Sequence, residues 1–283
     1  MSIYAISDLH LSLANPKPMD IFGPAWVNHP EKLRENWDAV VTDADIVLLP
    51  GDLSWAMRLP EAKPDLDFVA ERPGRKILIR GNHDYWWQRQ ATSRIQRIVD
   101  RNLTFLQGTS VVMDGAGITG TRGWRVDWEA RGHGWERGRV AEWENGRQGL
   151  PSPRPTNTPR RRLSGFGASA TLPNLGEGTE SEIRDPQSGE RILQRELAYL
   201  ERGLQSIPES ASPKIAMLHF PPFDERLQPN EFAHLLAKYS VDILVYGHVH
   251  IGLGGWLEGM ADGVRYYMAS ADVVDFVPQL IVP

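Results

Sequence analysis

Five short apolar runs recur along the chain, and each of them ends in a cluster of polar side chains. The runs are Ile3–Ser7, Asp45–Leu49, Lys76–Ile79, Lys214–Leu218 and Val241–Tyr246. Their length and their β-branched residues are typical of buried strands. Apolar residues at helical spacing precede the second, fourth and fifth runs and follow the third. Strands that alternate with helices predict an α/β fold in layers, built around a mostly parallel core sheet.

A second group of strand-like runs is expected to extend the sheets with antiparallel pairs. These runs are Leu103–Leu106, Ser110–Met113, Gly117–Gly120, Tyr266–Ala269 and Phe276–Val282. A chain of 283 residues is long enough to bury a sizeable core without disulfides or structural metals. We interpret residues 1–283 as a single domain that carries one long insertion.

The stretch at about 128–189 differs in composition from the rest of the chain. It is rich in Gly, Pro, Arg, Ser and Thr, it contains the triplet Arg160-Arg161-Arg162, and its apolar periodicity is weak. Such a segment is too long for an ordinary loop in a compact domain. We interpret it as a partly flexible insertion, and we favour a solvated variable loop over a lid or an arm that contacts an anionic partner.

Composition excludes several kinds of chemistry. The chain has no cysteine, which excludes disulfides, thiolate metal ligands and cysteine nucleophiles. Lys plus Arg is 31 and Asp plus Glu is 36, so the net charge of −5 argues against a generally basic coat for nucleic acid. The sequence shows neither a secretory signal nor an apolar run of membrane-spanning length. We therefore expect a cytoplasmic protein that does not enter a membrane.

The polar clusters after the five apolar runs hold the residues that carry chemistry. They are Asp8-Leu9-His10, Gly51-Asp52-Leu53, Arg80-Gly81-Asn82-His83-Asp84, His219 and Gly247-His248-Val249-His250. Ligands of open α/β sheets bind outside the carboxyl ends of the strands. Five clusters at five strand ends are therefore expected to converge on one crevice, although they span most of the chain.

The clusters contain five of the eight histidines, together with three aspartates and one asparagine. Imidazole and carboxylate ligands without thiolate suit Mn, Fe, Zn or Ni. One ion takes three or four such ligands, whereas this set offers seven good candidates. Seven ligands are enough for two ions that share a bridging carboxylate, and two such ions clamp a phosphoryl group and activate a water molecule.

The clusters resemble, in their order, the motifs of the calcineurin-like metallophosphoesterases. Those motifs are Asp-x-His, Gly-Asp, Gly-Asn-His-Asp/Glu, an isolated His and Gly-His-x-His, and all five occur here. The resemblance covers the chain apart from the insertion. Two further segments resemble a bacterial branch of predicted phosphohydrolases, namely Lys17-Pro18-Met19-Asp20-Ile21-Phe22-Gly23 and Ser54-Trp55-Ala56-Met57-Arg58. The resemblance implies a four-layer α/β/β/α sandwich with the metals at one end.

The same resemblance implies a role for each motif residue. Asp8, His10 and His250 would bind the first metal, Asn82, His219 and His248 would bind the second, and Asp52 would bridge both. His83 would lie beside the phosphate, either as general acid for the leaving group or as a stabiliser of transition-state charge. Asp84 would orient His83 and support its charged form. The implied cofactors are two divalent or trivalent ions, with Mn expected first and Fe, Zn or Ni as alternatives.

The expected activity is hydrolysis of a phosphomonoester or a phosphodiester, with a small-molecule or nucleotide substrate favoured. A hydroxide that bridges the metals would attack phosphorus in line with the leaving oxygen. Two alternatives stay open, namely a nuclease or protein phosphatase that acts on a macromolecule, and a metal-binding module without catalysis. The acidic net charge disfavours the nuclease, and the presence of His83 with every ligand candidate disfavours the module.

Overall fold

The computed structural model describes residues 1–88, 91–124, 140–142, 186–224, 227–251 and 256–283. Most of the expected insertion lies outside these residues. The described parts of it are strand β7, Val140–Glu142, and the beginning of helix α5 at Pro186. Helix α5 thus begins just before the approximate end of the expected insertion, and the interpretation as a single domain with an insertion stays a prediction.

One sheet has five strands in the order β12-β1-β2-β3-β4. These strands are β1 (Ile3–Ala5), β2 (Ile46–Leu49), β3 (Arg75–Leu78), β4 (Leu103–Phe105) and β12 (Gln279–Val282). β1 to β4 are parallel, and β12 is antiparallel to β1. The prediction of a mostly parallel core is confirmed in this sheet.

The other sheet has seven strands in the order β5-β6-β8-β9-β11-β10-β7. In addition to β7 they are β5 (Ser110–Met113), β6 (Ala116–Thr121), β8 (Lys214–Leu218), β9 (Ile243–Tyr246), β10 (Trp256–Ala261) and β11 (Val264–Met268). β6, β8, β9 and β11 are parallel, whereas β5 and β10 are antiparallel to β6 and β11.

The expectation of antiparallel pairs is confirmed for β5 with β6, for β12 with β1 and for β11 with β10, but it is wrong for β4. β4 is parallel to β3 because the short helices α3 (Tyr85–Gln88) and α4 (Thr92–Gln96) carry the chain back between them. β11 is parallel to β9 because β10, a strand that the sequence pattern did not predict, reverses the chain first.

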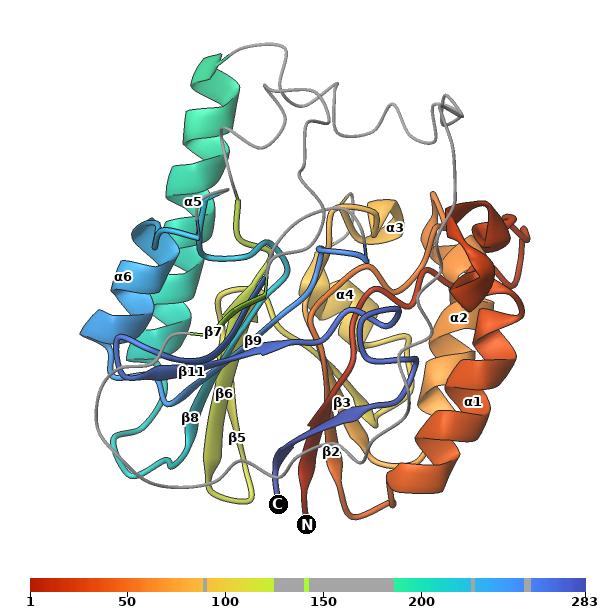
Figure 1. Ribbon diagram of the computed structural model, residues 1–283, viewed down its shortest axis with the longest axis horizontal. Coiled ribbons are helices and arrows are strands. Elements are labelled where there is room, and N and C mark those ends of the chain that lie inside the picture. The colour runs from red at the N-terminus through yellow and green to blue at the C-terminus, as the bar shows by residue number, and fades with distance from the viewer. Residues whose placement is uncertain (89–90, 125–139, 143–185, 225–226, 252–255) are drawn as a thin grey trace.

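Helices cover the outer face of each sheet, and the two inner faces pack on each other (Figure 1). The first sheet is covered by α1 (His29–Val40), α2 (Leu59–Ala70), α3 and α4, and the short 3-10 helices η1 (Met19–Phe22) and η2 (Pro24–Trp26) precede α1. The second sheet is covered by α5 (Pro186–Gln205) and α6 (Glu231–Lys238). In the part of the chain that the structure describes, no helix is both long enough and apolar enough to cross a membrane.

Strand β2 shows how the layers follow from side-chain alternation. Val47 and Leu49 pack toward the helices that cover the first sheet. Ile46 and Leu48 point the other way, into the core that the two sheets share with residues such as Met217. Because both faces of the strand are buried, the run is apolar throughout rather than alternating. The structure has the four layers α/β/β/α that the family resemblance implies.

Helix α5 packs against β6 at a glycine, and this contact leads to a test of the fold. A Cβ on Gly203 would lie 2.1 Å from Thr119 Oγ1 and 3.3 Å from Thr119 Cβ. In an exposed helix, Gly→Ala adds about 1 kcal/mol of stability. Here we expect Gly203→Ala to lower the free energy of unfolding by about 1–3 kcal/mol, because overpacking outweighs helix propensity.

Chemical denaturation of single and double variants checks this expectation. In a Thr119→Ala background the same Gly203→Ala substitution should cost less, because the hydroxyl that the new methyl group meets is gone. An equal cost in both backgrounds would contradict the packing argument.

Candidate metal centre

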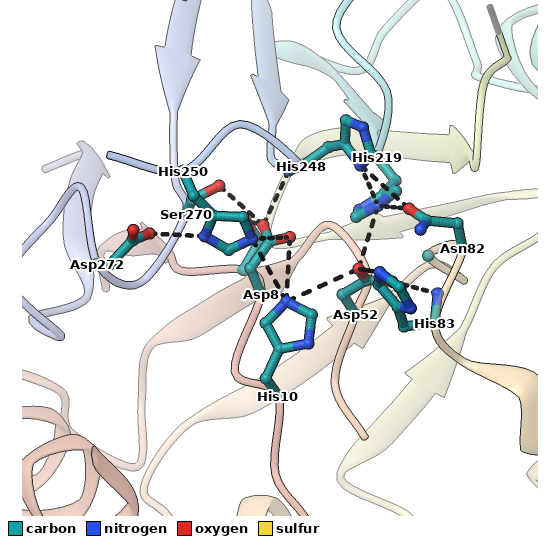
Figure 2. A network of polar contacts seen from close by, with 12 residues as sticks. Asp8, His10, Asp52, Asn82, His83, His219, His248, His250, Ser270 and Asp272 are labelled. Carbon is teal, nitrogen blue, oxygen red and sulfur yellow. Dashed lines mark hydrogen bonds and ion pairs between the residues drawn. The ribbon is translucent and has the colours of Figure 1, made fainter. Parts of the chain in front are cut away.

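The seven predicted ligand residues lie together at the end of the sandwich where the parallel strands of both sheets finish (Figure 2). The residues that follow β1, β2 and β3 of the first sheet are Asp8, His10, Asp52 and Asn82. Those that follow β8 and β9 of the second sheet are His219, His248 and His250. A parallel bridge between Ser7 and Ser270 joins the two sheets at this end.

Four of these residues have a left-handed backbone, which a side chain normally disfavours. The angle φ is 55° at Asp8, 47° at His10, 52° at Asp52 and 71° at His248. Such conformations cost about 1–3 kcal/mol each and gather at functional sites, where the surrounding structure enforces them. The chain accepts this strain to turn sharply after each strand and aim the side chains at a common point.

The first group of ligand atoms comes from Asp8, His10 and His250. His10 Nε2 lies 3.4 Å from His250 Nε2, and Asp8 Oδ1 lies 4.0 Å and 3.8 Å from these two nitrogens. Asp8 Oδ1 is buried and accepts no hydrogen bond from the described residues. Two imidazoles and an unpartnered carboxylate oxygen at this spacing fit a metal ion.

The other oxygen of Asp8 is fully occupied, and this fixes the direction of Oδ1. Asp8 Oδ2 accepts hydrogen bonds from Ser7 Oγ (2.5 Å), Ser270 Oγ (2.9 Å) and the His248 amide (3.0 Å). The backbone of Gly247 approaches the same atom so closely that a Cβ there would lie 2.3 Å from it. The glycine of the Gly-His-x-His motif is thus required by the packing of the carboxylate.

The second group of candidate ligand atoms surrounds His219. His219 Nδ1 donates to the Pro50 carbonyl (3.0 Å), and burial lowers the pKa of His219 well below its usual value. The neutral ring therefore presents a lone pair on Nε2. This lone pair lies 2.6 Å from Asn82 Oδ1, which is itself 3.0 Å from His248 Nδ1. A cation between these atoms removes their mutual repulsion, so this group also fits a metal.

Asp52 lies between the two groups. Its Oδ2 is 3.9 Å from His10 Nε2 and 3.5 Å from His219 Nε2. Its Oδ1 accepts a hydrogen bond from the His83 amide at 2.8 Å. A Cβ on Gly81 would lie 2.0 Å from Oδ1, so only glycine lets the loops after β2 and β3 come this close.

Burial has opposite effects on the acids and the bases of the centre. It raises the pKa of Asp8 and, with the added repulsion from Asp8 and Asp84, raises the pKa of Asp52 well above its usual value. It lowers the pKa of His10 well below its usual value. Burial thus works against the charged form of all three groups. A bound metal would supply positive charge beside the two carboxylates and favour their ionised forms.

His83 lies at the more open side of the same centre. Its side chain is 24% exposed, and its Nε2 is 4.0 Å from Asp52 Oδ2. Its ring contacts Trp55 at 4.3 Å between centroids, and Nδ1 is 3.3 Å from the Tyr85 hydroxyl. Burial, together with the nearby His250 and Lys17, lowers the pKa of His83 to about 3, so the free imidazole is neutral.

Asp84 has different partners from those expected. Its Oδ1 accepts from the amides of Leu53 and Ser54 and from Trp86 Nε1, and its Oδ2 accepts from the amides of Asp52 and Gly81. Both oxygens are therefore used by the two loops, and no hydrogen bond between described residues joins Asp84 to the His83 ring. The expectation that Asp84 orients His83 is replaced by a role in holding the loops after β2 and β3 together.

Sequence reasoning missed two residues that contact the centre from the end of β11. Ser270 donates to Asp8, and Asp272 Oδ1 is 2.9 Å from His250 Nδ1. Burial opposes a charge on His250, but the bond and the charge of Asp272 prevail and raise its pKa. The signal was present, because the predicted run Tyr266–Ala269 also ends in a polar cluster, Ser270-Ala271-Asp272.

Comparison with known proteins agrees with the motifs and with the layers. The calcineurin-like phosphoesterase family model matches residues 1–252. The Gene 66 proteins of Mycobacterium phages D29 and L5 are 37% and 35% identical over 84 and 78 residues, which is 29% and 28% of this chain. These matches span only 40% and 37% of the phage proteins.

A solved structure, the phosphopantetheinyl hydrolase from Mycobacterium tuberculosis, is similar with a TM-score of 0.51 at 16% identity. The similarity covers 100% of this chain and 96% of that one, and at this identity it establishes the fold alone. The fold, the Asp and His groups at the strand ends and the match over residues 1–252 agree. The chain belongs to the calcineurin-like phosphoesterase family.

Proposed function

We propose that this phosphoesterase hydrolyses a phosphomonoester or phosphodiester of a small molecule or nucleotide at a two-metal centre. The observation that carries the proposal is the position of Asp52 Oδ2, which is 3.9 Å from His10 Nε2 in one ligand group and 3.5 Å from His219 Nε2 in the other. A carboxylate shared by two ligand groups is the arrangement that a pair of neighbouring ions requires. Asp8, His10 and His250 would hold one ion, and Asn82, His219 and His248 the other.

The donor atoms restrict which metals are to be tested first. All are nitrogen or oxygen, which suits Mn, Fe, Zn or Ni, and we place Mn²⁺ first. When bound, two such ions supply a nucleophile from water at neutral pH and neutralise charge on the phosphoryl oxygens. The chain's own contribution is rigid placement. Trp55, for example, stacks on His10 with 4.9 Å between ring centroids and an interplanar angle of 25°.

His83 is the imidazole that we assign to the substrate rather than to a metal. Its amide donates to Asp52 Oδ1 at 2.8 Å, which holds the backbone of His83 beside the centre. The Tyr85 hydroxyl beside Nδ1 is able to donate a hydrogen bond to it. A neutral ring that accepts at Nδ1 carries its proton on Nε2. His83 would thus present an N–H to a phosphoryl or leaving-group oxygen.

Substitution of His83 separates its chemistry from metal binding. We expect His83→Asn to lower turnover by roughly a hundredfold or more, because a general acid or a positioned donor contributes about that much. Metal content, measured by inductively coupled plasma mass spectrometry, should stay at the wild-type value. Wild-type turnover in this variant would remove His83 from the reaction.

The two roles of His83 differ in their dependence on the leaving group. A general acid matters more as the leaving group becomes a worse anion, so the loss in His83→Asn would grow from p-nitrophenyl to alkyl esters. A donor that stabilises phosphoryl charge would give a similar loss across the series. Single-turnover rates on matched esters distinguish the two.

Substitution of Asp52 tests the bridge. Asp52→Asn replaces the shared carboxylate by a neutral amide, so we expect the variant to bind less Mn²⁺ than the wild type and to lose activity. The matched control is Asp45→Asn, a buried aspartate at the opposite end of β2. The control should keep its metal, and full metal occupancy in Asp52→Asn would contradict the bridging role.

Substrate class is tested with bis-p-nitrophenyl phosphate beside p-nitrophenyl phosphate, on protein stripped by chelator and then supplied with Mn²⁺. Diester cleavage that needs both Mn²⁺ and His83 would support a phosphodiesterase, and monoester cleavage alone would support a phosphatase. Phosphopantetheine esters belong in the second round, since the solved neighbour is named for that group. Strong salt-dependent binding of DNA or RNA would favour a nuclease instead. Metal binding without any turnover would favour the non-catalytic module.

A further inference from the structure

Within the described residues, the segment after β11 contacts the ligand group of Asp8, His10 and His250 through the side chains of Ser270 and Asp272. Ser270 and Asp272 are 0% and 4% exposed, and they lie beyond residue 252, where the family match ends. Their side chains bond to Asp8 and His250, which both belong to the first group. Within the described residues, neither side chain bonds to Asn82, His219 or His248 of the second group. The segment is therefore placed to act on one site selectively.

Asp272 accepts two hydrogen bonds, one from the His250 ring and one from the backbone next to it. Its Oδ1 accepts from His250 Nδ1 at 2.9 Å, and its Oδ2 accepts from the Ile251 amide at 3.0 Å. The amide bond fixes the carboxylate relative to the backbone that carries His250, so the ring plane is fixed as well. Because a carboxylate only accepts, it requires the proton on Nδ1 and leaves the Nε2 lone pair free. That Nε2 points toward Asp8 Oδ1, 3.8 Å away.

Ser270 completes the same arrangement on the carboxylate side. Its hydroxyl donates to Asp8 Oδ2 at 2.9 Å, which leaves Oδ1 to face His250 and His10. The backbone ties this serine to β1, because the Ser7 amide donates to the Ala269 carbonyl (2.7 Å) and the Ala271 amide donates to the Ser7 carbonyl (2.9 Å). Ser270 and Asp272 are thus fixed by the meeting of the two sheets.

In the second ligand group, the hydrogen-bond partner of the histidine Nδ1 is weaker than in the first group. His219 Nδ1 is held by the Pro50 carbonyl, which is neutral, whereas His250 Nδ1 is held by a carboxylate. A carboxylate behind a ligand imidazole makes the coordinating nitrogen a stronger donor than a carbonyl does, and removal of such a partner weakens metal binding about 10–100-fold. The histidine of the first site therefore has a charged hydrogen-bond partner, whereas the histidine of the second site has a neutral one.

We propose that Asp272, assisted by Ser270, is a positioning residue that sets the metal affinity of the first site alone. This inference rests on the proposed two-metal function, because it requires a metal held by Asp8, His10 and His250. Asp272 is not assigned as a ligand, because both of its oxygens accept hydrogen bonds from His250 and Ile251. It acts through His250 by fixing the tautomer, the ring plane and the donor strength of Nε2.

Mn²⁺ binding to the metal-stripped full-length chain tests the proposal without reference to activity. We expect Asp272→Ala to weaken one of the two Mn²⁺ sites about 10–100-fold in calorimetry and to leave the other unchanged. At limiting Mn²⁺, electron paramagnetic resonance should show isolated ions in place of a coupled pair. Asp272→Asn should fall between, because its amide oxygen still accepts from Nδ1 but carries no charge. Asp275→Asn, an exposed acid in the same segment, is the matched control and should behave as wild type.

A double-mutant cycle distinguishes positioning from a general structural effect. If Asp272 acts through His250, then Asp272→Ala has no further effect on Mn²⁺ affinity in a His250→Ala background. Unchanged affinity in Asp272→Ala, or equal weakening of both sites, would overturn the proposal. Failure of the two-metal function itself is recognised separately, because the wild-type protein would then bind fewer than two Mn²⁺ ions.

Discussion

Repulsion between the buried carboxylates of Asp8 and Asp52 is the interaction on which the rest of the centre depends. The charge of Asp8 adds to burial in raising the pKa of Asp52, and Asp84 raises it further. Arg122 contributes only a smaller, opposing effect. Burial lowers the pKa of His10 and of His219 well below the usual value, so these two imidazoles bring no positive charge to the acids. A metal ion interacts favourably with carboxylates and with imidazole lone pairs at the same time. The fold holds both kinds of group around a common point.

Holding these groups together costs free energy in strained backbone, and the packing of the layers offsets that cost. Strands of two sheets finish at the same end, and the chain leaves them through left-handed residues and through glycines that nothing larger could replace. Asp84 is the link on the side of the first sheet, since its carboxylate accepts from the loops after β2 and β3. The bridge between Ser7 and Ser270 is the link between the sheets. Buried cores on both sides of each sheet supply the rigidity.

Much of this arrangement was predictable, and the misses have physical causes. Side chains just after parallel strands gather at one edge of a sheet, so five polar clusters predicted the meeting of all seven candidate ligand residues. Helix α2 was missed because Pro60 and Pro64 break the usual pattern, although the first lies in the opening turn, where proline is tolerated. The prediction that Asp84 orients His83 was wrong, because adjacency in the sequence does not place two side chains in contact. A buried carboxylate needs donors for both oxygens, and the amides of two loops supplied them.

The atom beside Nδ1 distinguishes His219 and His250 from His83. The Pro50 carbonyl and the Asp272 carboxylate can only accept, so they place the proton of His219 and of His250 on Nδ1 and direct a lone pair inward. The Tyr85 hydroxyl beside His83 is also able to donate, which allows the opposite tautomer and an N–H directed at the substrate. Under the proposed function, identical side chains would thus serve as metal ligands or as a hydrogen-bond donor according to the atom beside Nδ1. The sequence motif contains the histidines, but this division depends on backbone and side-chain partners that only the folded chain brings together.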